Sequence, residues 1–250
     1  MKPKKSIFIS TGEISGDFYA GEIIKRLKER YDLKVLALGG ECVVQAGANL
    51  IYDTTAIATF GFFELLTTLR QWKIVWNKTA KILKCSPPSV AILIDNPGFN
   101  LRMVRLCHQI GIPIIYFIPP QVWVWNRRRA ALLSRYADWI LTIFPWEDNY
   151  FKSGQAQVKW VGHPVASKIP HFNTFNSNIT TKKIVFLPGS RRKEIDEYLK
   201  ILKKVLADFM NQHPDYDFFL VLASERYKNI FEKQLSGLPI NLKKREDLYQ

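Results

Sequence analysis

A carboxylate at the end of an apolar run is the first feature of this sequence that could do chemistry. The run Val90–Ile94 is short, aliphatic and uncharged, as in a strand buried on both faces, and Asp95 follows it directly. In a parallel α/β sheet, ligands bind just beyond the carboxyl ends of the strands. Asp95 is therefore a candidate general base that takes the proton of an attacking hydroxyl group. The alternative is an ordinary Asx turn between strand and helix.

A glycine-bearing turn, Ser10–Asp17, is the second candidate and follows another short apolar strand. Gly12 and Gly16 let the backbone approach a ligand closely at a helix N-terminus. The turn has neither the glycine spacing of a dinucleotide fingerprint nor the lysine of a P-loop. Its carboxylates, Glu13 and Asp17, favour sugar hydroxyl groups over a phosphate. The alternative is a plain helix start with acids near the positive end of the helix dipole.

A third candidate is an anion site in the stretch Pro188–Ile195, between an apolar strand and a helix. Gly189 and Ser190 leave backbone N–H groups accessible, and the helix dipole favours an anion. Arg191 can donate two hydrogen bonds to a phosphate or diphosphate. The alternative is a solvated basic first turn, although cations at a helix N-terminus oppose the dipole unless an anion is bound.

A basic stretch interleaved with apolar residues is the fourth feature. Residues 65–94 contain no acid, their lysines and arginines alternate with leucine, isoleucine and tryptophan, and the aromatic run Phe60–Phe63 precedes them. This composition is typical of a helix that lies in an anionic lipid interface. The alternative is a helix that packs on the core and exposes a basic face.

Two weaker motifs favour ordinary explanations. Tryptophans and arginines in residues 121–129 could stack on bases and bind phosphates, but they precede a helix in a proline turn rather than lying across exposed strands, so we expect no nucleic-acid partner. Asp215 and Asp217 have the spacing of a metal–diphosphate site, yet they fall in a turn. We therefore expect no metal.

Composition limits the class of protein. The 250 residues are 47% apolar, which suits a globular chain, and the formal charge of +14 points to an anionic partner such as a phosphorylated molecule, nucleic acid or membrane surface. Three cysteines, Cys42, Cys85 and Cys107, lie far apart, which suits a reducing cytosol without disulfides. The uncharged stretch 106–126 is interrupted by glycine and prolines, so we do not expect a spanning helix there.

The order of elements predicts the fold class. Strands and helices alternate from the N-terminus, including a helix expected over Phe18–Arg30, which predicts an α/β protein with a doubly wound parallel sheet in residues 1–165. Residues 166–181, rich in Ser, Asn, Thr and Pro, are predicted to be a linker. Residues 182–250 begin a second Rossmann-like domain with two or three strands, fewer than the five or six usual for such a domain, so we expect it to be partial.

Several motifs recur in an order that resembles a known family. They are Thr11–Asp17, Gly39–Gly40, Phe60–Glu64, Ile94–Arg102, Pro120–Trp125, Val161–Pro164 and Leu187–Arg191. Together they are similar to the successive motifs of the lipid-A-disaccharide synthases and cover nearly the whole chain. The resemblance implies a GT-B-like fold and an inverting transfer of diacylglucosamine from UDP to the 6-hydroxyl of diacylglucosamine 1-phosphate.

The resemblance also implies roles for single residues. Asp95 and Glu13 are the expected catalytic residues, with Asp95 as the base, and Arg191 is expected on the donor diphosphate. The other expected substrate-binding residues are Gly12, Gly16, Glu64, Asn100, Gln121, Gly189 and Ser190. No cofactor or metal is implied. The implied location is peripheral, on the cytoplasmic face of the inner membrane, and a homodimer is allowed.

One later motif of the family, a Ser-Gly-Thr-Ala-Thr-Leu-Glu run, does not occur before Gln250. We therefore expect little turnover from these 250 residues alone. Two other readings stay open at this point. One is a related UDP-sugar glycosyltransferase acting on a lipid or a cell-wall precursor, and the other is a non-catalytic module that binds a membrane surface.

Overall fold

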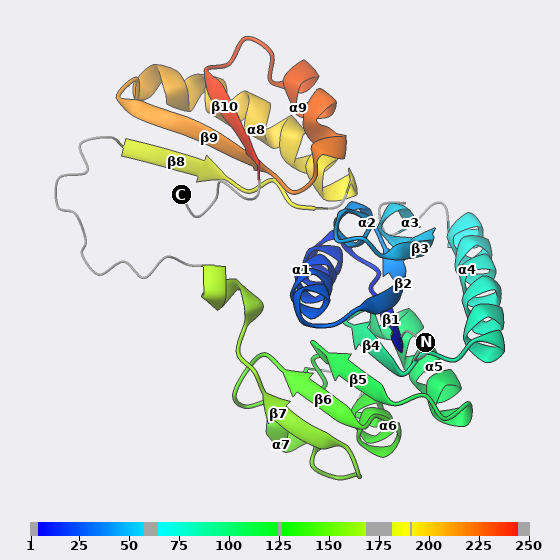
Figure 1. The fold of residues 1–250 in the computed structure, drawn as a ribbon. Coiled ribbons are helices and arrows are strands. Elements are labelled where there is room, and N and C mark those ends of the chain that lie inside the picture. Colours follow the sequence, from blue (N-terminus) through cyan, green and yellow to red (C-terminus); the bar gives the residue numbers. More distant parts are fainter. Residues whose placement is uncertain (1–4, 58–64, 125–126, 169–181, 191, 245–250) are drawn as a thin grey trace. The chain divides into compact units, whose positions relative to one another are not determined.

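The computed structural model describes residues 5–57, 65–124, 127–168, 182–190 and 192–244. They belong to two compact units, of which the first runs to Ala166 and the second takes up the chain from Ser167 (Figure 1). Glu64 and Arg191, both expected in the site, lie outside the described residues. Among the helices in the described ranges, none combines the length and the apolarity that a bilayer span requires.

The first unit is built on a seven-stranded sheet in which every neighbouring pair is parallel. Its spatial order is β3-β2-β1-β4-β5-β6-β7, so the predicted doubly wound parallel sheet is confirmed. The strands are β1 (Lys5–Ser10), β2 (Leu33–Gly39), β3 (Asn49–Asp53), β4 (Val90–Ile94), β5 (Ile114–Phe117), β6 (Trp139–Thr142) and β7 (Gln157–Trp160).

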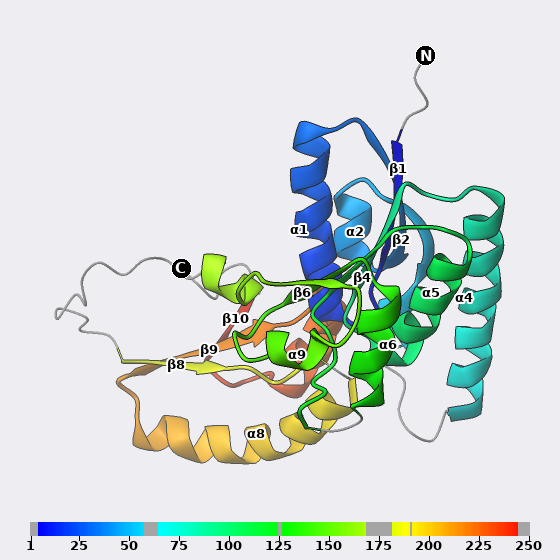
Figure 2. The ribbon, with the colours of Figure 1, turned by 90° about the horizontal axis from the view of Figure 1, so that it is seen from below.

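Helices cover both faces of this sheet, as Figures 1 and 2 show. They are α1 (Ile14–Arg30), α2 (Glu41–Gln45), α3 (Thr54–Ile57), α4 (Leu65–Cys85), α5 (Pro97–Gln109), α6 (Arg128–Tyr136) and α7 (Asp148–Phe151), followed by the 3-10 turn η2 (Pro164–Lys168). Alternate residues of β1 enter two separate cores: Phe8 packs with α4 and α5, whereas Ile7 and Ile9 pack with α1. Burial on both faces explains why the strands are continuous apolar runs.

The second unit contains a three-stranded parallel sheet in the order β10-β9-β8. Its elements are β8 (Lys182–Phe186), α8 (Arg192–Gln212), β9 (Tyr216–Leu222), the 3-10 turn η3 (Glu225–Tyr227), α9 (Lys228–Gln234) and β10 (Ile240–Lys244). Helix α8 buries one stripe, formed by Ile195, Leu199, Leu202, Leu206 and Met210, at the spacing of an amphipathic helix. The predicted second, smaller sheet is therefore present.

Candidate active site

The strand order of the first unit reverses between β1 and β4, which are neighbours in the sheet although about eighty residues separate them in sequence (Figure 1). Ligands of open α/β sheets bind outside the carboxyl ends of the strands at such a reversal. The glycine turn follows β1 and the Asp95 turn follows β4. The two turns touch, because a Cβ added to Gly12 would lie 2.1 Å from Nδ2 of Asn96. The fold thus brings the first two sequence candidates together.

Asp95 lies in a strained turn that its surroundings hold in place. Asp95 and Asn96 both have positive φ angles, 48° and 45°, in the left-handed region that residues other than glycine seldom adopt. The Asp95 N–H donates to the carbonyl of Phe117 (3.0 Å), and its carbonyl accepts from Asn100 Nδ2 (2.9 Å) and Tyr116 Oη (2.7 Å). The backbone is therefore well determined, and the half-buried Asp95 side chain stands at the end of β4.

Asn100 is fully buried, and its side chain forms hydrogen bonds with the ends of both β1 and β4, where the strand order reverses. Its Oδ1 accepts from the hydroxyl of Ser10 (2.7 Å), at the end of β1. Its Nδ2 also lies 3.1 Å from the carbonyl of Ile94, at the end of β4. These bonds make Asn100 a positioning residue for the Asp95 turn. The expected contact between Asn100 and substrate stays a prediction.

Tyr116 and Arg129 add to the site. No motif singled out Tyr116, and Arg129 was considered only within the weak tryptophan and arginine motif of residues 121–129. Tyr116 is fully buried in β5, and burial raises its pKa well above the usual value, with a further rise from the charge of Asp95 and a lowering from Arg129. Both charged groups thus act on the same phenol. Arg129 comes from the first turn of α6. Only the pairing of β4 with β5, which sets Ile94 beside Phe117, brings Tyr116 to Asp95, and no sequence motif signals it.

The two acids of the glycine turn have different surroundings. Glu13 is half-buried at the N-cap of α1. Asp17 is only 3% exposed, and its carboxylate accepts hydrogen bonds from the N–H groups of Gly40 (2.7 Å), Cys42 (2.9 Å) and Val43 (3.3 Å). Asp17 therefore caps α2 rather than reaching a sugar hydroxyl group.

Two buried polar atoms at the strand reversal have no hydrogen-bond partner within the described parts of the chain. They are Oγ1 of Thr11 and Nδ2 of Asn96. A Cβ on Gly16 would lie 2.0 Å from Thr11 Oγ1, so this hydroxyl packs on the first turn of α1. Buried polar groups in native proteins are nearly always paired, so unpaired ones mark strain or a ligand site.

The predicted anion loop of the second unit begins with a glycine that the backbone requires. Gly189 has a φ of 97°, and a Cβ there would lie 2.8 Å from the carboxylate of Glu194. The Ser190 N–H points to the same carboxylate (3.4 Å), and the Ser190 carbonyl accepts from Tyr227 Oη (3.4 Å). The Ser190 N–H is thus taken up by a carboxylate of the chain itself, and the anion site expected in this loop stays a prediction.

The remaining sequence candidates are Gln121 and the possible metal site at Asp215. Gln121 is exposed, beyond the end of β5. Asp215 pairs with Lys182 at 2.6 Å, and this hydrogen bond lowers the pKa of Asp215, which fits the turn that the sequence favoured. Across the described ranges, no three His, Cys, Asp or Glu side chains gather as metal ligands.

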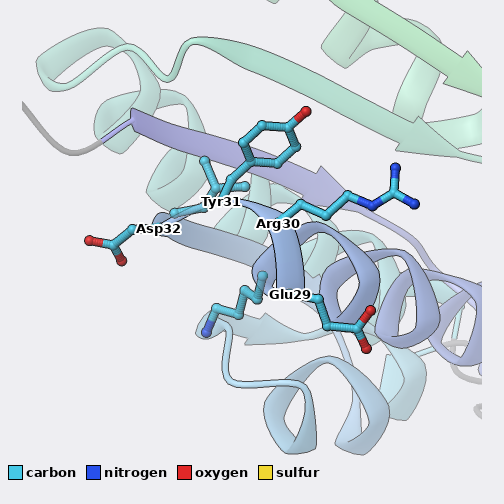
Figure 3. A pocket seen from close by; sticks show the side chains of 6 residues that line it. Glu29, Arg30, Tyr31 and Asp32 are labelled. Carbon is cyan, nitrogen blue, oxygen red and sulfur yellow. The ribbon is translucent and has the colours of Figure 1, made fainter.

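A surface pocket lies far from these groups in the fold. It is lined by Lys28–Leu33, where α1 ends and β2 begins, at the amino ends of the strands (Figure 3). Figure 3 shows Glu29, Arg30 and Asp32 pointing in different directions. Polar groups that diverge do not form a binding site.

Helix α4 divides the residues of the basic stretch between its two faces. Trp72 and Trp76 pack on Phe99, with ring centroids 4.9 and 6.0 Å away, and so belong to the core. Leu69 (57% exposed) and Ile74 (49%) remain on the surface beside exposed lysines and an arginine. The two tryptophans therefore pack on the core, as the alternative interpretation of the sequence predicted. The exposed face of α4 still carries both apolar and basic side chains.

Solved structures of similar fold identify the class of architecture. A UDP-GlcNAc 2-epimerase from Neisseria meningitidis bound to UDP-GlcNAc superimposes with a TM-score of 0.58 at 12% identity, over 98% of this chain and 73% of that chain. A UDP-GlcNAc 2-epimerase from Methanocaldococcus jannaschii does so with a TM-score of 0.55 at 16% identity, over 96% and 73%. The fold is therefore GT-B-like, the fold class that includes glycosyltransferases and these epimerases.

The family model described as lipid-A-disaccharide synthetase matches residues 7–246, so the chain belongs to that family. The chain is similar to lipid-A-disaccharide synthase 1 of Legionella pneumophila, with 32% identity over 241 residues, 91% of this chain and 63% of the relative. The synthase of Gloeothece citriformis is 33% identical over 240 residues, 89% of this chain and 62% of the relative. The chain thus spans about three fifths of the length of these relatives.

Proposed function

We propose that this chain carries the acceptor side, and part of the donor side, of an inverting glycosyltransferase that forms the lipid A disaccharide. The 6-hydroxyl of diacylglucosamine 1-phosphate attacks the anomeric carbon of UDP-diacylglucosamine. The bond from that carbon to the UDP oxygen breaks, UDP leaves with the electron pair, and Asp95 takes the hydroxyl proton. The observation that carries the proposal is the position of Asp95, held in a strained turn where the strand order reverses.

The other expected residues take the following roles in this proposal. Gly12 and Gly16 keep the α1 turn close to the Asp95 turn, and Glu13 stands at the start of α1 near the acceptor sugar. In this proposal Gln121 and Glu64 also serve the acceptor. Gly189, Ser190 and Arg191 bind the donor diphosphate just before α8 begins, where the helix dipole favours an anion.

A peripheral location at the cytoplasmic face of the inner membrane is part of the same proposal. Both substrates carry acyl chains, so the enzyme must meet them at a lipid surface. The exposed apolar residues Leu69 and Ile74 on α4, with the basic side chains around them, supply a surface that suits anionic lipid. A homodimer is compatible with this arrangement.

The test compares two carboxylates in a transfer assay with a radiolabelled acceptor, so that slow rates can be measured. Loss of a general base typically costs at least about a hundredfold in rate, which we expect for Asp95→Asn. Asp32→Asn is the matched control, because Asp32 is an exposed carboxylate at the opposite end of the sheet. Equal rates for the two variants would refute Asp95 as the base. Transfer from other UDP-sugars in preference to UDP-diacylglucosamine would favour a related glycosyltransferase.

A further inference from the structure

Aromatic side chains gather beyond the carboxyl ends of β5 and β6. We call Trp123, Phe144, Trp146 and Tyr150 the aromatic platform. Phe144 and Trp146 stack at 4.8 Å with an interplanar angle of 6°. Trp123 meets each of them edge-on at 6.4 Å and lies 6.1 Å from Tyr150. The rings therefore form one cluster of aromatic side chains in contact.

The loop that presents the platform is held by buried hydrogen bonds. Glu147 is almost completely buried, and its Oε2 accepts from the N–H groups of Ile143 (2.8 Å) and Phe144 (2.9 Å). The hydroxyl of Thr142, at the end of β6, donates to Asp148 (2.5 Å). The platform is therefore preorganised, and a ligand that binds it need not order the loop.

The platform is exposed in spite of this order. Trp146 is 50% exposed and Tyr150 is 37% exposed. Exposed apolar side chains that gather in one place can mark a site for an apolar ligand, since their burial is worth about 25 cal/mol for each Å². The platform thus has the character of a site for an apolar ligand.

The platform lies on the same edge of the sheet as Asp95. Strands β4, β5 and β6 are consecutive neighbours and run in the same direction (Figure 1). With neighbouring strands about 4.8 Å apart, the end of β6 is about 10 Å from the end of β4. A ligand whose polar end meets Asp95 can therefore lay an attached chain across the platform.

We propose that the aromatic platform binds a fatty-acyl chain of the lipid-linked sugar acceptor while its hydroxyl group meets Asp95. This inference rests on the proposed function. The flat ring faces suit methylene groups, and the Glu147 carboxylate is turned inward to backbone N–H groups. A nucleotide diphosphate would instead need cations or N–H groups directed at the ligand.

The test measures affinity rather than rate, with two soluble ligands and isothermal titration calorimetry. One ligand is a short-chain diacylglucosamine 1-phosphate, and the other is glucosamine 1-phosphate without acyl chains. We expect Trp146→Ala to weaken the binding of the acylated ligand about tenfold or more and to leave that of the unacylated ligand unchanged. Trp146→Phe should retain most of the affinity, because the stacked ring is kept.

Trp139→Ala is the matched control. Trp139 is 38% exposed, but it is the first residue of β6 and so lies at the opposite end of the strand. The inference is overturned if both tryptophan variants bind the acylated ligand equally, or if the unsubstituted chain binds the two ligands equally. It is also overturned if Trp146→Ala impairs only cosedimentation with phosphatidylglycerol vesicles, since the platform would then contact the membrane. The Asp95 test measures the transfer rate, whereas this test measures ligand affinity. The proposed function and the acyl-chain inference can therefore be refuted independently.

Discussion

At the scale of single residues, Gly12 and Asn96 show how closely two distant segments approach. The Nδ2 atom of Asn96 occupies the space that a Cβ at position 12 would need. Asn96 also lies in the left-handed region next to Asp95. A side chain at position 12 must therefore displace Asn96, and with it the turn that holds the proposed base.

We predict that Gly12→Ala destabilises the chain by about 1–3 kcal/mol, as expected for overpacking a buried site, and also lowers the transfer rate. Gly98→Ala is the control, because a Cβ at position 98, in the first turn of α5, meets nothing within 4 Å. That change should be neutral or stabilise the chain by up to about 1 kcal/mol through helix propensity. Urea unfolding gives both values. Equal stability of the two variants would contradict the close approach.

At the scale of elements, the sequence predicted what depends on local pattern. Val90–Ile94 forms a strand with the predicted bounds because its apolar run is buried on both faces. The helix expected from Phe18 instead begins at Ile14, because Gly16 packs against Thr11 within the first helical turn, where glycine suggested a loop. Strand β3, over Asn49–Asp53, was not predicted, because its short mixed pattern becomes a strand only by pairing with β2.

The residues of the candidate site likewise include some that the sequence could locate and others that depend on the tertiary structure. Asp95 and the glycine turn could be located by sequence, since strand ends are visible as boundaries of apolar runs. The contributions of Tyr116 and Arg129 could not, because they depend on strand register and on the position of α6. Asp17 was expected to face a ligand but caps α2, a short helix that the sequence did not reveal.

Helix α5 carries the next prediction, which concerns its buried thiol. Burial raises the pKa of Cys107 from 9.0 to about 12, so the native thiol keeps its proton over the range in which an unfolded chain loses it. Folding stability from this group is present below pH 9 and decreases as pH rises toward 12. We expect iodoacetamide to alkylate exposed Cys85 rapidly and Cys107 only after unfolding. Peptide mass spectrometry measures the extent of alkylation at each cysteine. Rapid labelling of Cys107 in the native protein would contradict its burial.

At the scale of the whole molecule, a formal charge of +14 acts together with the apolar surface of α4. In the proposed peripheral location, the charge would attract the chain to anionic lipid from a distance, and Leu69 and Ile74 would bury their side chains at the interface. Two contributions of different origin should respond differently to salt, because only the electrostatic attraction is screened.

We predict that cosedimentation with anionic vesicles decreases as salt rises to about 1 M, where the screening length is about 3 Å. The double change Leu69→Ser and Ile74→Ser should lower it further at every salt concentration. Val44→Ser serves as the control, since Val44 is also an exposed aliphatic residue but lies on α2. Binding that is insensitive to salt and to the α4 changes would remove the membrane part of the proposal.

The left-handed pair at positions 95 and 96 has a consequence for evolution of this protein in the laboratory. Glycine would relax both residues without strain. A library screened for heat survival alone would therefore favour glycine there and lose the carboxylate, whereas, if Asp95 is the base as proposed, one screened for lipid product would keep it. Selection for thermal stability and selection for activity would therefore favour different residues at positions 95 and 96.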